Sequence, residues 1–248
     1  MTDHGPARCL SIGNVIARGF QVYFRNLATF VPLSLVAYIP AWIGLAVIGE
    51  GAVFDPTAPG AGGAIMLLLS MIASYWVQAA LVYGTISSMR GHPAGFSEML
   101  TQALAALAGV ILLAIVISLL VSLGLLLFIV PGIVVMVMFF VAIPAAVVER
   151  GGIRASLARS RELTAGHRWS VLALIVVMFF IIMAIGSIVG LLVGGGGGQP
   201  GLAGLWLNEI LGMFVGGIWA MITAVAYHDL RIAREGGDTD GIARALDG

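Results

Sequence analysis

A stretch of 46 residues without a charged side chain, Ala103 to Val148, constrains the fold more than any other feature of this sequence. A helix of roughly 20 apolar residues crosses a hydrocarbon core about 30 Å thick. One helix of 46 residues would be about 69 Å long, more than twice that thickness. Proline removes a backbone donor and glycine permits a tight turn, so Pro131-Gly132 is the natural break. The stretch therefore predicts two membrane crossings joined at this dipeptide.

The composition of the whole chain agrees with a membrane protein. The 248 residues are 60% hydrophobic and 10% charged, whereas soluble domains carry about a quarter charged residues. Such a chain has too few charges to cover a soluble fold. The sequence predicts an all-α membrane protein, a single polytopic domain over residues 1–248 with six transmembrane helices. The predicted spans lie near residues 27–48, 64–88, 104–128, 132–148, 170–193 and 203–227.

The basic residues are twelve arginines, and their positions predict the orientation in the membrane. They precede the first span, follow the second, crowd residues 150–168 and occupy the tail 228–248. The connections 50–63, 129–132 and 194–203 contain none. In bacterial membranes, short loops rich in Lys and Arg stay on the cytoplasmic side. The pattern predicts a multi-pass protein of the bacterial inner (plasma) membrane with its N- and C-termini in the cytoplasm.

Two segments outside the spans have the pattern of amphipathic helices. Residues 12–26 place apolar side chains on one broad face, and residues 153–164 have a weaker apolar stripe flanked by arginines. Such helices lie in the membrane interface. A shorter candidate, Phe96 to Gln102, precedes the third span. These segments predict a unit that occurs three times in the chain. Each unit consists of one interfacial helix on the cytoplasmic side, followed by one transmembrane hairpin.

The segment from Phe128 to Trp169 is the most distinctive part of the chain. It contains FIVPG, IPAAVVERGG and IRASLARSRELTAGHRW, and the tail contains AYHDLRIAREGGDTD. Together with the opening LSIGNVIARGFQVYFRNLATFVPL, it resembles the membrane-domain family associated with bacterial glycerophosphoryl diester phosphodiesterases and related uncharacterised inner-membrane proteins. The resemblance implies a polytopic module of largely unknown activity. The phosphodiesterase activity of some members resides in a separate soluble domain that nothing here matches, so no catalytic residue is carried over.

The arginine-rich connection is the candidate binding site. The residues proposed to bind an anionic lipid or a phosphate are Arg154, Arg159, Arg161 and Arg168. A guanidinium group binds phosphate through two hydrogen bonds, and a basic residue near the surface attracts anionic lipid by about 1 kcal/mol. The alternative is that these charges only set the topology. Glu162 follows Arg159 by three residues, which places it to pair with that arginine across one helical turn.

Two further patterns lie inside the spans. The second span has a polar stripe, and the sixth contributes the only ionisable residue within a span; these residues are Ser70, Ser74, Gln78, Thr85 and Glu209. The stripe fits two roles, the lining of a wet cavity and interhelical hydrogen bonding, of which the second is the commoner use. Glu209 is expected to be a shallow, hydrated carboxylate, with a buried proton carrier as the alternative. The pairs Gly186/Gly190 and Gly212/Gly216 are GxxxG steps, which predict close packing of the fifth and sixth spans, with a dimer contact as the alternative.

No arrangement of residues indicates catalysis, so the sequence predicts no catalytic residue, no metal and no cofactor. The leading hypothesis is a non-enzymatic membrane module that organises lipids or partners. Its expected partners are the lipid bilayer, anionic phospholipids, and a membrane protein or a second copy of the chain, but no nucleic acid. The alternative is a transporter or lipid-handling carrier with a polar cavity near the second span. An enzyme acting on lipid would depend on Glu149, His167 and His228.

Overall fold

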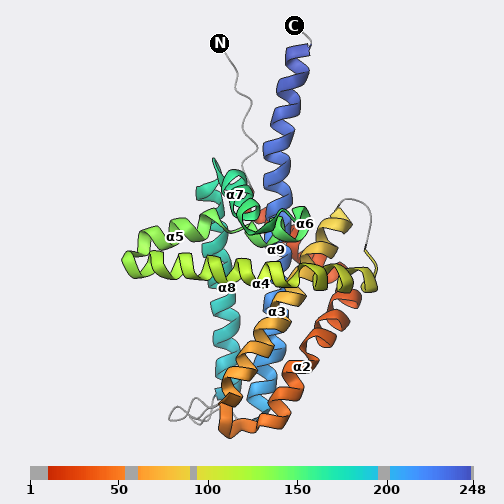
Figure 1. The fold of residues 1–248 in the computed structure, drawn as a ribbon, viewed down its shortest axis with the longest axis vertical. Coiled ribbons are helices and arrows are strands. Elements are labelled where there is room, and N and C mark those ends of the chain that lie inside the picture. Colours follow the sequence, from red (N-terminus) through yellow and green to blue (C-terminus); the bar gives the residue numbers. More distant parts are fainter. Residues whose placement is uncertain (1–10, 54–60, 90–93, 195–201, 247–248) are drawn as a thin grey trace.

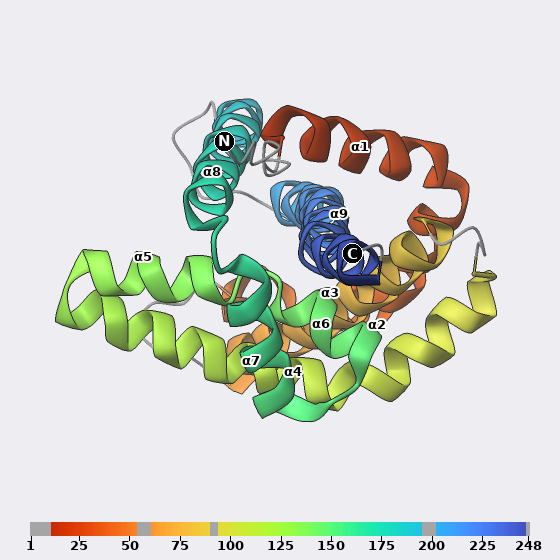
Figure 2. The same ribbon diagram turned by 90° about the horizontal axis from the view of Figure 1, so that it is seen from above.

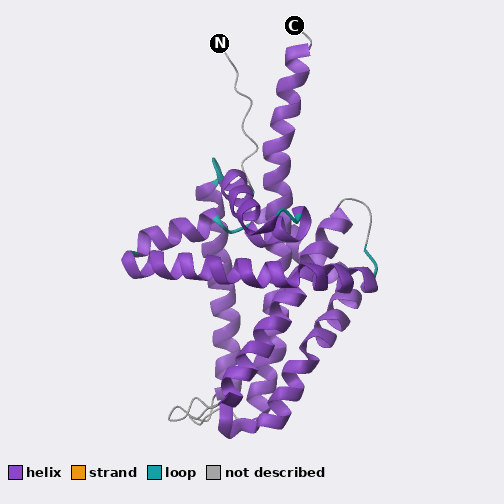
Figure 3. Cartoon of the chain, in the orientation of Figure 1, coloured by secondary structure: helices purple, strands orange, loops and turns teal. Residues whose placement is uncertain are grey.

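A computed structural model describes residues 11–53, 61–89, 94–194 and 202–246, and within these ranges the chain is helical without strands (Figure 3). The helices are α1 Ile12–Arg25, α2 Leu27–Val53, α3 Ala61–Met89, α4 Phe96–Leu127, α5 Ile129–Met138, α6 Ala142–Glu149, α7 Gly152–Thr164, α8 Arg168–Gly194 and α9 Leu202–Leu246. Six segments are long and apolar enough to cross a membrane: Leu27–Gly44, Leu68–Met89, Phe96–Leu127, Ile129–Glu149, Arg168–Ile188 and Ile210–Glu235. The prediction of an all-helical chain with six such segments is confirmed, which indicates a multi-pass membrane protein.

The six segments do not all run in the same direction. Figure 1 shows α2, α3, α8 and α9 along one axis, while α4 and α5 lie side by side across it. Seen along that axis, α9 is central, with α1 on one side and α3 and α6 on the other (Figure 2). The structure therefore does not have all six segments aligned along one axis. The α4–α5 pair is oriented differently from the other four segments.

The orientation of α4 follows from its first turns. Residues Phe96 to Gln102, predicted as a separate interfacial helix, are continuous with the rest of α4. No glycine or proline interrupts this helix before Gly109, so the direction set by its first turns continues unbroken. Those turns cross α3, where Tyr83 Oη donates a 2.7 Å hydrogen bond to Glu98 Oε1.

The turn between α4 and α5 lies at Phe128, three residues before the predicted break. Pro131 instead falls in the first turn of α5, where a missing N–H costs no intrahelical hydrogen bond. The two helices approach closely, because a Cβ atom added to Gly124 would lie 2.8 Å from the Cα atom of Gly132. Gly132, which was predicted to permit a tight turn, therefore allows α4 and α5 to pack closely together.

The segment predicted as the fourth span is divided into two helices. α5 ends at Met138, and a turn from Phe139 to Val141 separates it from α6. Because helix ends leave carbonyl groups without an intrahelical donor, Met138 O needs another partner. The hydroxyl of Ser160 on α7 donates to it at 2.9 Å. The polar part of the α7 stripe thus caps α5 and is buried in protein.

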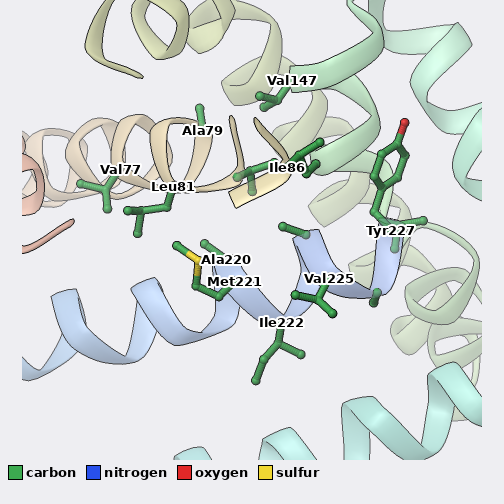
Figure 4. Packing of buried hydrophobic residues seen from close by; sticks show 14 of the residues in the cluster. Val77, Ala79, Leu81, Ile86, Val147, Ala220, Met221, Ile222, Val225 and Tyr227 are labelled. Carbon is green, nitrogen blue, oxygen red and sulfur yellow. The ribbon is translucent and has the colours of Figure 1, made fainter. Parts of the chain in front are cut away.

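The core is the contact between α3 and α9. In Figure 4, Leu81 of α3 faces Met221 of α9, and Val147 of α6 lies next to Ile86. All of these side chains are buried. The residues from Ala220 to Tyr227 are buried on every side of α9, as expected for the central helix. Dispersion contacts in such close packing hold apolar helices together when lipid replaces water around them.

The apolar face of α1 packs on α9. Val15, Gly19 and Tyr23 are its buried residues. A Cβ atom on Gly19 would lie 2.8 Å from Cγ1 of Ile222, so only glycine permits this approach. Burial raises the pKa of the Tyr23 hydroxyl to about 12. The face that the sequence assigned to the lipid interface is therefore at least partly a protein contact.

Substituting Gly217 by alanine tests this contact. A Cβ atom there would lie 2.8 Å from the Tyr23 ring, whereas one on the neighbouring Gly216 meets no atom within 4 Å. Overpacking costs about 1–3 kcal/mol, while alanine in a helix gains about 0.5–1 kcal/mol over glycine. We expect Gly217→Ala to lower the thermal unfolding temperature and Gly216→Ala to raise it slightly. Equal shifts in the two variants would contradict the α1–α9 contact.

The predicted glycine packing between the last two spans is not found among the described residues. Within the described ranges, a Cβ atom added at Gly186, Gly190, Gly212 or Gly216 meets nothing within 4 Å, and all four glycines are exposed. The reason is geometric, because α8 and α9 do not bring these glycines against each other. A contact with a second copy stays a prediction.

Candidate functional site

Charged side chains gather at one end of the bundle, which we call the charged end. It is formed by α1, α6, α7 and the part of α9 after Tyr227, where α9 extends beyond the other helices (Figure 1). On one side, Arg18 Nη1 of α1 lies 2.8 Å from Oδ1 and 3.1 Å from Oδ2 of Asp229 on α9. His228 Nδ1 lies 3.5 Å from the same carboxylate. The ion pair between Arg18 and Asp229 links α1 to α9.

On the other side, Arg159 of α7 is the centre of a carboxylate cluster. Its Nε donates to Glu149 Oε1 at 2.9 Å, its Nη1 to Glu162 Oε2 at 3.3 Å, and its Nη2 to Glu235. Tyr227 Oη donates to the same Glu149 oxygen at 2.6 Å. The planar guanidinium fork matches three acceptors in different directions. One side chain thus joins α6, α7 and α9.

This geometry changes the role predicted for Arg159. Its side chain is only 19% exposed. Partial burial lowers its pKa, but the hydrogen bonds to Glu149 and Glu235 outweigh this and raise the pKa above its ordinary value. The predicted pairing with Glu162 is confirmed. An arginine that already serves three carboxylates has little capacity for a lipid phosphate, which argues against the anion-binding role predicted for Arg159.

The other three candidate arginines face outward. Arg154, Arg161 and Arg168 are exposed, and none forms an ion pair with a residue in the described part of the chain. Arg154 and Arg161 are seven residues apart, which puts them on the same face of α7 about 10 Å apart. Trp169, beside Arg168 at the start of α8, is 84% exposed. Helix α7 therefore turns one arginine inward and two outward.

Two hollows lie at or near the charged end. An open depression of about 630 Å³ is lined by Ile86, Val148, Glu149, Tyr227, His228, Arg231, Ile232 and Glu235. A second hollow of about 200 Å³, between α4, α6 and α7, has mostly small apolar walls such as Ala105 and Gly109, with Arg150 and Ser156 at its polar part. Arg150 donates a hydrogen bond to Gln102 of α4. The smaller hollow therefore combines an apolar wall with a guanidinium group.

The polar stripe of the second span does not border either hollow. Thr85 is buried and its hydroxyl donates to Leu81 O at 2.7 Å and to the sulfur of Met221, while Ser74 donates to Met71 O at 3.2 Å. Ser70 and Gln78 are half-buried. Thr85 thus serves interhelical hydrogen bonding between α3 and α9. The side chain of Glu209 lies outside the described residues.

Sequence reasoning missed the partners that α9 contributes to the charged end. Arg231 Nε donates to Glu235 Oε2 at 2.8 Å across one helical turn, and this i, i+4 spacing was a usable signal. The link from Arg159 to Glu235 spans 76 positions and has no local signature. Across the described residues, no three His, Cys, Asp or Glu side chains gather as metal ligands.

Comparisons with known proteins add no relative. No family model, no curated protein and no solved structure matches this chain.

Proposed function

We propose that this protein is a non-enzymatic integral membrane module that gathers anionic phospholipids at its charged end. The observation that supports this function is that Arg154, Arg161 and Arg168 face outward. The fourth candidate, Arg159, is already paired with three carboxylates. The asymmetric distribution of arginines along the sequence supports a cytoplasmic position for this end in a bacterial inner membrane. The sequence resemblance to phosphodiesterase-associated membrane domains supports a module of this kind.

The depth of the outward arginines suits phospholipid headgroups. Trp169 is amphipathic and highly exposed, and such side chains sit at the membrane–water interface. Arg168 precedes it directly, and Arg161 lies in the last turn of α7. Arginine stems extend along apolar surface while their charged groups reach the headgroups. The three guanidinium groups therefore offer bidentate hydrogen bonds at the level of lipid phosphates.

The neighbouring hollow supports binding of a whole lipid. Its small apolar walls fit part of an acyl chain, and Arg150 lies at its polar part. A phospholipid has the same two-part chemistry, with an anionic headgroup joined to hydrocarbon.

Replacing the outward arginines by glutamine tests the proposal. Three basic residues at about 1 kcal/mol each set an upper limit of about 3 kcal/mol, or roughly a hundred-fold in affinity. We expect Arg154→Gln/Arg161→Gln/Arg168→Gln to weaken phosphatidylglycerol binding at least ten-fold. The measurement is native mass spectrometry of the detergent-solubilised protein titrated with phosphatidylglycerol or with phosphatidylcholine.

The matched control replaces the same three residues by lysine. It keeps the charge but loses the planar fork, so its affinity should fall between those of the wild type and the glutamine variant. Circular dichroism checks that the helices persist. If the glutamine variant keeps its phosphatidylglycerol affinity, these arginines only set topology and the proposed function fails.

A further inference from the structure

From Ala103 onward, the exposed surface of the α4–α5 hairpin is uncharged and mostly apolar, and its exposed polar side chains among the described residues are Ser118 and Ser122. Its tip carries large exposed side chains on both helices, and Leu126 is 84% exposed. The exposed large apolar residues around the turn are Leu119, Leu120, Leu123, Leu125, Leu126, Leu127, Phe128, Ile129, Val130 and Val134. No charged residue occurs between Ala103 and Val148. The tip therefore presents no charged face to its surroundings.

Helix α1 provides an internal comparison. It also lies across the bundle, but it exposes Asn14, Arg18, Gln21 and Arg25 on one side. A helix at the membrane surface needs such a polar face. A helix that is apolar all round is immersed in protein or in lipid. Because the described part of the chain does not cover the tip of the hairpin, we assign its surroundings to acyl chains.

The crossing with α3 sets the depth of the hairpin. Tyr83 and Gly84 contact Glu98 and Met99 of α4, and Tyr83 lies six residues before the end of α3 at Met89. Six residues correspond to about 9 Å along a helix. The second anchor, the hydrogen bond from Arg150 to Gln102, also lies near the charged end. Helix α4 then runs across the bundle axis and stays near this level (Figure 1).

We propose that the α4–α5 hairpin lies in the plane of the membrane, inserted among the acyl chains of the leaflet at the charged end. A helix with its side chains is about 10–12 Å wide, and one leaflet contributes about 15 Å of the hydrocarbon core. The hairpin thus fits within one leaflet. The two antiparallel helices of the hairpin expand that leaflet alone, so the protein acts as a wedge and prefers curved membranes. This inference needs no property of the outward arginines.

Four exposed leucines on α4 allow a direct test. Leu104, Leu112, Leu119 and Leu126 are exposed and lie within about 80° of one another around the helix. The first and last are 22 residues apart, about 33 Å along the axis. Single cysteines at these positions, in a Cys9→Ser chain, would be spin-labelled in phosphatidylcholine vesicles. Their depth is measured from relaxation by oxygen and by a water-soluble nickel complex.

Helix α8 supplies the matched control. Its exposed residues Val176, Met183 and Leu191 span 15 positions of a helix that runs along the bundle axis. We expect their depths to change steadily by about 20 Å, whereas the four α4 labels should agree within about 5 Å, in the leaflet at the charged end. A steady change along α4 would overturn the proposal and establish two ordinary crossings.

The remaining outcomes are also decisive. If the four α4 labels give equal values but are all relaxed by the water-soluble nickel complex, the hairpin lies in water. That result would overturn the assignment of its surroundings to lipid. Labels that neither reagent reaches, together with spin–spin broadening, would show that a second copy of the chain covers the hairpin, and would also overturn lipid as its surroundings. The wedge itself requires that the labelled protein favour small vesicles over large ones. An even distribution would overturn it, and the arginine-to-glutamine variant should leave both depth and vesicle preference unchanged.

Discussion

Replacing Arg159 by alanine is expected to lower the free energy of unfolding by about 2–3 kcal/mol. The change leaves Glu149, Glu162 and Glu235 close together without their shared cation. Breaking a buried ion pair costs about 3–5 kcal/mol, and the carboxylates here are 32%, 52% and 46% exposed, which lets water screen part of the repulsion. Chemical unfolding of the detergent-solubilised protein measures the loss.

The control lies two residues away on the same helix. Arg161 is exposed and outward, and surface substitutions of this kind change stability by less than about 0.5 kcal/mol. Arg161→Ala should therefore unfold like the wild type. Adding Glu235→Gln to Arg159→Ala should recover part of the loss, because one repelling charge is removed. If Arg159→Ala and Arg161→Ala behave alike, the cluster does not stabilise the charged end.

Local patterns predicted the elements of this fold well. The segments expected at residues 12–26 and 153–164 are helices Ile12–Arg25 and Gly152–Thr164, because a period of 3.6 residues is visible without knowledge of the partner. The partner itself was not visible. The apolar face of the first segment and the polar stripe of the second are buried by helices distant in sequence.

The direction of α4 and α5 could not be read from their composition. Hydrophobicity identifies the surroundings that a helix prefers, but a helix in the plane of a leaflet and one across it present the same apolar surface. The deciding contacts, Tyr83 with Glu98 and Arg150 with Gln102, join separate parts of the chain. In the same way, glycine spacing reveals room for a close neighbour, but Gly212 and Gly216 meet none among the residues that the structure describes.

Replacing Gly124 by leucine is expected to separate α5 from α4. A Cβ atom there lies 2.8 Å from Cα and 2.9 Å from N of Gly132, and 3.2 Å from the carbonyl carbon of Pro131. These are backbone atoms, so no side-chain rotation relieves the clash. Overpacking costs about 1–3 kcal/mol. Once the two apolar helices separate, lipid solvates each of them as favourably as the partner helix did. The hairpin should therefore open.

Spin labels at the exposed residues Leu119 and Met136 report the opening as a longer and broader distance distribution. Gly109→Leu is the matched control on the same helix, because a Cβ atom at Gly109 meets no atom within 4 Å. Its distances should equal those of the wild type. A hairpin that opens only in Gly124→Leu would show that close backbone contact holds it together in lipid. Unchanged distances in both variants would mean that the turn at Phe128 alone keeps α5 beside α4.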